Sequence, residues 1–547
     1  MRMLKNVLKL SVVATIALCI TSCGGGNAKK ASEKLNANDL EKLEIVGQKI
    51  DGAVDNMIPS NAVAALRIQP KQLWGKAFDG LDSYNRYQLE NMIDGICEHL
   101  PILREPETLG LNLEMSVVLS VSLDIRSMEP FKGNVETCIV ASLSNRDNFI
   151  KQLDNFVQEI NRENEYKITK TSLGEKYVHY MIYADDQGAF DLGVFANAAV
   201  LRVTYAPSSI FAGMPTTLAK LFANGAPANS EGLNKFYSSY SDVALWVDFE
   251  KSMNNIIPLA KEYGGETAKQ FKQLEQFMPM YKGASLVSEL SFNEGNTVLE
   301  FAVYGSEKLK EQALKYNTPS SDKYFKYLPS SSALVLNVAI KDFPGLVEEL
   351  SKTNSEFADL FESLEPIGFD KELFEGFPGV ITVALDGYQL DGETPHIALF
   401  MECDANLWDL LASYIYEVAD EAGPNLYCID GKYYIGYVDG AIMLMDSTIM
   451  RRMEYGYVDS FSETELAGEI NKGGSVINFE EFPYDMLNDA ARNMDNSFSG
   501  YDFLEYLSSV VITTSSDFMS ATIKVNMGDP YQNFLSKVFN FALNRMK

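Results

Sequence analysis

Several short segments of the chain alternate apolar side chains with polar or small ones. Residues 117–124, 299–304 and 522–527 each follow this period of two. Successive side chains of a strand point to opposite faces of a sheet, so each segment predicts a strand with one covered face and one solvated face. This alternation is typical of antiparallel sheets.

Other segments place apolar residues every three or four positions, which predicts amphipathic helices. Helices are predicted at residues 71–78 and, most clearly, at 147–160. The apolar stripe of the longer segment consists of Phe149, Ile150, Leu153, Phe156, Val157 and Ile160. Strand and helix patterns recur in the order strand-helix-strand-strand-helix. We therefore expect an α+β fold whose mainly antiparallel sheets are covered by helices.

The chain also repeats itself, which is a signal to seek before local structure. The segment IPSNAVAALRIQPKQL at residues 58–73 corresponds to LPSSSALVLNVAIKDF at 328–343, and later matches follow in the same order at a shrinking offset. We predict duplicated halves at residues 55–318 and 322–547, each holding repeated strand-helix-strand-strand-helix units. The predicted equivalent pairs include Leu66 with Leu336 and Phe301 with Ile523.

The N-terminus has the layout of an export signal. Three basic residues within the first nine precede an apolar run at residues 10–20, and Thr21-Ser22-Cys23 follows. An apolar run of this length is too short to span a bilayer. The segment resembles a bacterial lipobox, which implies that Cys23 becomes the acylated first residue. We predict a signal peptide at 1–22 and a lipidated N-terminus and tether at 23–54. The alternative is an ordinary secretory signal in which Cys23 is incidental.

Composition and charge narrow the class of protein. A chain of 547 residues is too long for one core, and 46% hydrophobic with 22% charged residues is typical of globular domains. The formal net charge of −29 repels phosphate backbones, and no basic cluster offsets it. We therefore expect an acidic protein that does not bind nucleic acid.

The sequence lacks the motifs that carry chemistry. It has no G-x-S-x-G elbow and no P-loop, and its three histidines are not at metal-ligand spacings. These are His99, His179 and His396, and we expect them to be structural and remote from any cysteine or carboxylate cluster. We predict no catalytic residues, no metal site and no cofactor.

Cysteines and tryptophans also have structural interpretations. We expect free thiols, or at most one disulfide, among Cys97, Cys138, Cys403 and Cys428. The three tryptophans are expected to pack between helices and sheets, and the alternative is a sugar-stacking platform. These residues are Trp74, Trp246 and Trp408.

The lipobox and the two proline-led strand segments at 58–73 and 328–343 together resemble an uncharacterised family of Bacteroidetes lipoproteins known only as a domain of unknown function. The resemblance implies no catalytic residue and no substrate. Residues 24–30 contain no acidic residue, which in that phylum favours the periplasmic side of the outer membrane. We therefore expect a lipid-anchored cell-envelope protein, a non-catalytic binding or scaffold module with the membrane and an envelope protein or glycan as partners. The alternative is a glycan-binding or carbohydrate-active envelope protein.

Overall fold

A computed structural model gives the fold of this chain. The residues that it describes are 58–97, 108–128, 131–163, 168–173, 177–184, 188–205, 231–263, 278–353, 379–387, 396–482 and 500–545. This part of the chain forms two compact units. The first contains the chain up to Ser291 with residues 303–306 and 535–547, and the second contains residues 292–302 and 307–534.

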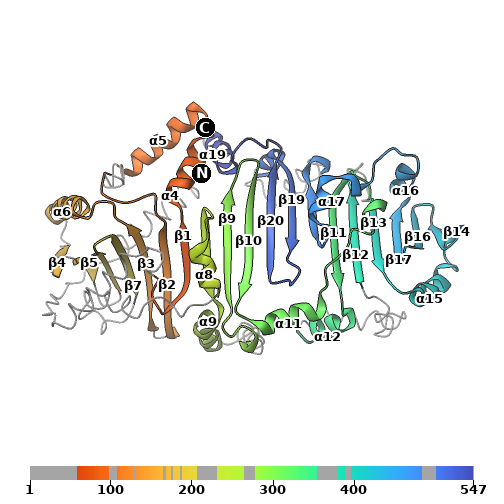
Figure 1. The fold of residues 1–547 in the computed structure, drawn as a ribbon, viewed down its shortest axis with the longest axis horizontal. Coiled ribbons are helices and arrows are strands. Elements are labelled where there is room, and N and C mark those ends of the chain that lie inside the picture. The colour runs from red at the N-terminus through yellow and green to blue at the C-terminus, as the bar shows by residue number, and fades with distance from the viewer. Residues whose placement is uncertain are drawn as a thin grey trace. The chain divides into compact units, whose positions relative to one another are not determined.

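The first unit is built on nine strands in the order β4-β5-β6-β7-β3-β2-β1-β8-β9, each paired antiparallel with its neighbours (Figure 1). Its strands are β1 (Ala62–Ile68), β2 (Val117–Met128), β3 (Phe131–Ser142), β4 (Thr169–Leu173), β5 (Tyr177–Ala184), β6 (Gly188–Val194), β7 (Ala198–Tyr205), β8 (Val243–Asp248) and β9 (Ser285–Phe292). Its helices are α4 (Pro70–Phe78), α5 (Ser83–Cys97), α6 (Arg146–Glu163), α8 (Glu231–Ser238), α9 (Phe249–Tyr263) and most of α19 (Phe534–Asn544).

The second unit is built on eleven antiparallel strands in the order β10-β20-β19-β18-β11-β12-β13-β17-β16-β15-β14. Its strands are β10 (Asn296–Tyr304), β11 (Ser332–Ile340), β12 (Gly379–Asp386), β13 (Ile397–Glu402), β14 (Asp420–Gly423), β15 (Leu426–Ile429), β16 (Tyr433–Val438), β17 (Ala441–Asp446), β18 (Gly474–Asn478), β19 (Leu507–Thr514) and β20 (Ser520–Met527). Its helices are α11 (Glu307–Tyr316), α12 (Phe343–Thr353), α15 (Ala405–Ile415), α16 (Ser447–Glu454) and α17 (Glu465–Glu469).

The predicted α+β class, with helices covering the sheets, is wrong. The described chain is instead a large antiparallel sheet structure with twenty strands and eleven α-helices. Several helices are too short to cover many strands, since α17 has 5 residues and α8 and α16 have 8 each. The predicted strand-helix-strand-strand-helix units also contain too few strands, because β4, β5, β6 and β7 form a four-stranded meander within residues 169–205. Individual elements were nevertheless predicted well, as β1, β2, α4 and α6 lie where the patterns place them.

Helix α6 shows why a local pattern was sufficient for a helix. Asn145 precedes the helix, and its side-chain oxygen accepts a hydrogen bond from the Asn148 backbone N–H at 3.0 Å, which satisfies one of the free N–H groups of the first turn. The predicted stripe then packs against the sheet of the first unit. Buried members of this core are Phe149, Leu153, Val157, Tyr180, Leu192 and Ala199.

The second unit has an aromatic core centred on β13. Phe400 is fully buried and lies between two tyrosine rings, Tyr324 at 5.2 Å and Tyr327 at 5.4 Å between ring centroids. Stacked aromatic pairs add to the free energy gained from burial alone. The neighbouring strands contribute methionines and valines to the same core.

Candidate functional site

The described residues contain two candidate functional sites. One is a cluster of buried charges in the first unit, and the other is an exposed apolar helix surface in the second. The predicted lipidation residue, Cys23, lies outside the described residues, as do the predicted signal peptide and tether. His99 lies outside them as well. The contacts of the other predicted site residues show whether each is buried, paired or exposed.

The buried charges lie on neighbouring strands of the β5-β6-β7 meander. Asp191 of β6 is directly opposite Arg202 of β7, and Cys138 of β3 is opposite Arg202 on its other side. Asp191 accepts hydrogen bonds from the Arg202 Nε and Nη2 atoms at 2.9 Å each. His179 of β5 lies with its Nε2 atom 2.7 Å from the Asp191 carboxylate. The expectation that the histidines lie away from carboxylates is therefore wrong for His179.

Electrostatics and burial both indicate a structural role for this cluster. Burial alone would raise the pKa of the Asp191 carboxyl, but the charge and hydrogen bonds of Arg202 and the hydrogen bond to His179 bring its pKa below the usual value. The side chains of all three residues are at most 2% exposed. Groups that are this deeply buried and already paired with one another favour a structural role for the cluster.

The buried thiol beside this cluster is not set up for chemistry either. Burial raises the pKa of Cys138, which disfavours the reactive thiolate. Burial likewise raises the pKa of Cys403 to about 11. Cys138, Cys403 and Cys428 are all free, in agreement with the predicted free thiols, and the side chain of Cys97 lies outside what is described.

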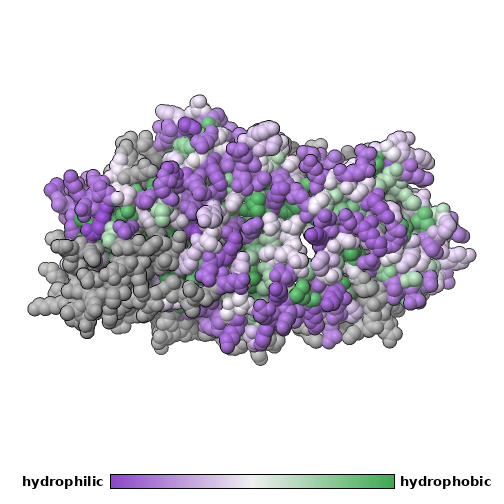
Figure 2. Space-filling model, in the orientation of Figure 1, coloured by the Kyte–Doolittle hydropathy of each residue, from purple (hydrophilic) through white to green (hydrophobic). Residues whose placement is uncertain are grey.

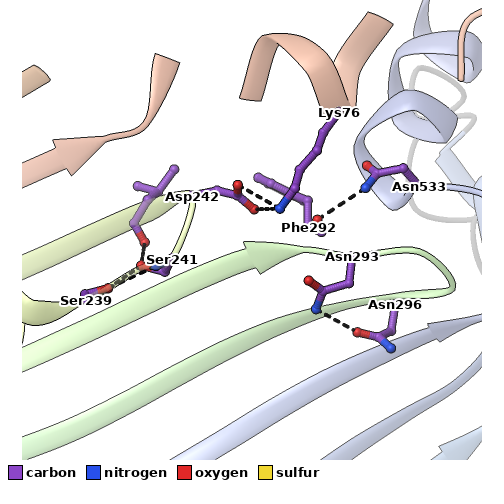
Figure 3. A network of polar contacts seen from close by, with 9 residues as sticks. Lys76, Ser239, Ser241, Asp242, Phe292, Asn293, Asn296 and Asn533 are labelled. Carbon is purple, nitrogen blue, oxygen red and sulfur yellow. Dashed lines mark hydrogen bonds and ion pairs between the residues drawn. The ribbon is translucent and has the colours of Figure 1, made fainter. Parts of the chain in front are cut away.

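A second polar network of the first unit joins α4 to the turn before β8 (Figure 3). The Lys76 ammonium contacts both carboxylate oxygens of Asp242, at 2.8 and 2.6 Å. Next to it, the hydroxyl oxygens of Ser239 and Ser241 are 2.7 Å apart. Arg67 of β1 donates to the Tyr237 and Ser239 carbonyls, and so satisfies free carbonyls at the end of α8. These contacts join elements of the fold.

The exposed feature is the outer face of α15 in the second unit. Its inner face is buried: Leu407 and Trp408 pack against β16 and β17, with Trp408 stacked on Tyr437 at 5.9 Å between ring centroids. The outer face and the turn that follows expose large apolar side chains. We call this set the α15 patch, and its members and exposed fractions are Leu410 (46%), Tyr414 (64%), Tyr416 (69%) and Val418 (73%).

Large apolar side chains are exposed at several places on the described surface, and four of them make up the α15 patch. On the face drawn in Figure 2, hydrophilic residues cover most of the described surface, and hydrophobic residues appear between them in small groups. Scattered exposed apolar residues need no explanation, but several adjacent ones often mark an interaction surface. The patch residues are close together in sequence, on one helix and the turn that follows it. The patch is therefore the stronger candidate for a binding site.

Sequence reasoning missed this patch, although a signal was present. The repeat match that aligns Phe149 with Trp408 also aligns Lys151 with Leu410 and Asn155 with Tyr414. All four of these outward positions are exposed, but only the second helix carries apolar residues there. A comparison of the two helices position by position would have identified the patch.

The three tryptophans were predicted to pack between helices and sheets, and two of them do. Trp246 and Trp408 are buried in packing contacts, as predicted. Trp74 is 55% exposed, so that its predicted burial is wrong. It stacks on Phe78, one helical turn further along α4, at 4.3 Å between ring centroids. The helix thus provides the contact that the sheet was expected to provide.

The described residues also bear on metal binding and on membrane insertion. Within them, no group of three histidine, cysteine or acidic side chains could hold a metal ion. No described helix combines the length and the apolar character needed to cross a membrane. His396 of the second unit has its Nδ1 atom 3.0 Å from the carboxylate of Asp446.

These observations define a large antiparallel β-sheet protein with buried, paired charges and an exposed apolar surface on α15. The chain belongs to the family described as Domain of unknown function (DUF4836), whose family model matches residues 54–434. The expected relationship to a domain of unknown function is thereby confirmed. No curated protein and no solved structure matches the chain.

Proposed function

We propose that this chain is a lipid-anchored cell-envelope protein that binds a partner without catalysing a reaction. The observation that carries the binding function is the α15 patch, since an apolar helix surface of this kind is stabilised when a partner covers it. Burial and pairing of Asp191, Arg202 and His179 support a non-catalytic role. The proposed location is the outer membrane, facing the periplasm, as in the lipoproteins of Bacteroidetes that the sequence resembles.

The proposed lipid anchor at Cys23 can be tested by substitution. Cys23→Ala should abolish incorporation of a fatty-acid analogue and release the protein from the membrane fraction, because the acyl chains supply the membrane affinity. Cys428→Ala is the matched control, since it also removes a thiol but should label like the unchanged protein. A Cys23→Ala variant that still labels and stays with membranes would show that the anchor proposal is wrong.

Site-specific photo-crosslinking in cells tests the binding function. A photoreactive residue at Leu410 should give a discrete adduct of higher mass. The same residue at Lys151, which occupies the aligned outward position on α6, should give none. Absence of an adduct at position 410, or equal adducts at both positions, would contradict a binding role for the patch.

A glycan-binding or carbohydrate-active envelope protein is the second candidate. The exposed Trp74 favours it, with Tyr84 (49% exposed) and Tyr87 (59% exposed) on the next helix. Aromatic rings that reach solvent are the side chains on which sugars stack. Retardation in polysaccharide-containing native gels that Trp74→Ala abolishes, or turnover of polysaccharide by the purified protein, would favour this candidate.

We also propose that the two halves arose by duplication. The strand order β4-β5-β6-β7-β3-β2-β1-β8-β9 of the first unit has the same form as β14-β15-β16-β17-β13-β12-β11-β18-β19 within the second. In these orders Leu66 on β1 and Leu336 on β11 occupy corresponding strands. An experimental structure in which those two residues took different places in the strand order would contradict the proposal.

A further inference from the structure

The α15 patch has a charge environment as well as an apolar surface. Residues 403–431, which include α15, β14 and β15, contain no lysine or arginine. Four carboxylates of this segment are exposed next to the patch in sequence. They are Asp409, Glu417, Asp420 and Glu421. None of the four forms an ion pair with a described residue, whereas several acidic groups elsewhere in the second unit do.

The aligned part of the first unit is different. Helix α6 has Lys151 and Asn155 at its outward positions, and Asp154 is paired with Lys170 of β4 at 2.6 Å. Asp154 is thus neutralised locally, and the two outward positions aligned with the patch carry polar side chains. The second unit combines apolar side chains with unpaired negative charge. The difference makes α6 an internal reference for a helix without a partner.

We propose that the α15 patch binds a polypeptide segment that carries both apolar and basic side chains. The apolar side chains would cover Leu410 and Tyr414, while lysine or arginine side chains would pair with the surrounding carboxylates. This inference rests on the proposed binding function and specifies the chemistry of its partner. Charge complementarity of this kind speeds association and selects the partner, while the covered apolar residues supply most of the affinity.

The charges also decide between the other occupants. An anionic membrane surface would be repelled by the unpaired carboxylates. A second copy of this chain carries a net charge of −29 and would be repelled as well. A neutral glycan could stack on Tyr414 and Tyr416 and donate hydroxyl hydrogen bonds to the carboxylates, but it carries no positive charge to pair with them. A basic, partly apolar polypeptide is the occupant that uses both properties of the surface.

The test uses the full mature chain and a fluorescent amphipathic helical peptide of leucine and lysine, with binding measured by anisotropy. A peptide with glutamate in place of lysine is the probe control. We expect the lysine peptide to bind and the glutamate peptide not to bind. Leu410→Gln/Tyr414→Asn, which changes no charge, should weaken binding by at least about thirtyfold. Tyr531→Asn, at another exposed tyrosine of the second unit (87%), should leave binding unchanged.

A second pair of variants tests the charges. Asp420→Asn/Glu421→Gln should weaken binding about threefold to tenfold and reduce its salt dependence. Glu307→Gln/Glu311→Gln removes the same charge from two exposed positions of α11 and should have little effect. Thermal unfolding of every variant verifies that the fold is retained. Equal weakening by both pairs would mean that the peptide responds only to net charge, and would overturn the proposal.

Other outcomes also overturn it. Binding of the glutamate peptide, of anionic vesicles or of polysaccharide that Leu410→Gln/Tyr414→Asn abolishes would assign the patch to another ligand class. Self-association in sedimentation velocity that the same variant abolishes would assign it to a second copy. An adduct at position 410 in cells without binding of the lysine peptide would overturn the partner chemistry and leave the binding function intact. If neither the adduct at position 410 nor binding of the lysine peptide is observed, the binding function and the partner chemistry are both contradicted.

Discussion

Asp191→Asn is expected to lower the free energy of unfolding of the first unit by about 3–5 kcal/mol. The substitution removes the carboxylate that accepts two hydrogen bonds from Arg202, and so leaves a guanidinium in the interior without its closest counter-charge. Glu136 offers little compensation, because its Oε1 atom is 3.9 Å from the Arg202 Nη1 atom. A buried charge without its partner costs far more than the pair contributes when intact.

Urea denaturation followed by tryptophan fluorescence measures this change, since Trp246 is buried in the same unit. Two compact units can unfold separately, so each transition is fitted on its own. Asp147→Asn is the matched control: it makes the same chemical change where the side chain is 95% exposed, and should alter stability by less than about 0.5 kcal/mol. Similar effects of the two substitutions would contradict the structural role of the buried cluster.

The same variant has a defined pH dependence. The folded state lowers the pKa of Asp191, so the unfolded state binds the proton more readily. The stabilisation from the ionised carboxylate is therefore fully present above its unfolded pKa of about 4, and is lost as the pH falls through the lower folded value. The difference in stability between the unchanged protein and Asp191→Asn should thus be constant near neutral pH and shrink in acid.

The buried cluster shows which part of the fold the sequence could predict. Alternation identified the strands, because each pattern depends on a few consecutive residues. The meeting of His179, Asp191 and Arg202 depends instead on the register between β5, β6 and β7, and a shift of one residue would move each side chain to the other face. No local pattern specifies that register, and the histidine was therefore expected to lie apart from carboxylates.

The same reasoning explains the errors in the helices. The pattern at residues 147–160 predicted α6 because a helix carries its own hydrogen bonds and its stripe is visible in the sequence. How many strands such a helix covers depends on the size of the sheet, which is set by long-range pairing. The four-stranded meander at 169–205 enlarged the sheet without adding a helix. The sheet therefore has more strands than the predicted strand-helix-strand-strand-helix units contain, although α6 packs on this meander.

Trp74 and Trp408 show that the burial of a single residue could not be predicted from the local sequence. Both follow a strand in the sequence, yet one is 55% exposed and the other 3%. The stacking partner of Trp74 is on its own helix, whereas Trp408 reaches Tyr437 on β16. Local sequence does not distinguish these environments. The α15 patch was missed for a related reason, because an apolar residue on a helix is normally assigned to the buried face.

Trp408→Ala is expected to lower the free energy of unfolding of the second unit by about 3–5 kcal/mol, since it removes a large buried side chain and leaves a cavity between α15 and the sheet. Trp74→Ala is the matched control and should cost less than about 1 kcal/mol, because its ring is mostly solvated. Urea denaturation of both variants gives the two values, and equal losses would contradict the packing described for α15.

Trp408→Ala also distinguishes two requirements for peptide binding: the packing that holds α15 in place, and the exposed side chains of the patch that contact the peptide. Leu407, Trp408 and Ile442 form the buried core beneath the helix, so loss of the indole should loosen the helix that carries the patch. Peptide binding should then weaken although every exposed residue is unchanged. Leu410→Gln/Tyr414→Asn should weaken binding while stability stays within about 0.5 kcal/mol of the unchanged protein, as for other exposed substitutions. A Trp408→Ala variant that is destabilised but binds the lysine peptide normally would mean that the binding surface lies elsewhere.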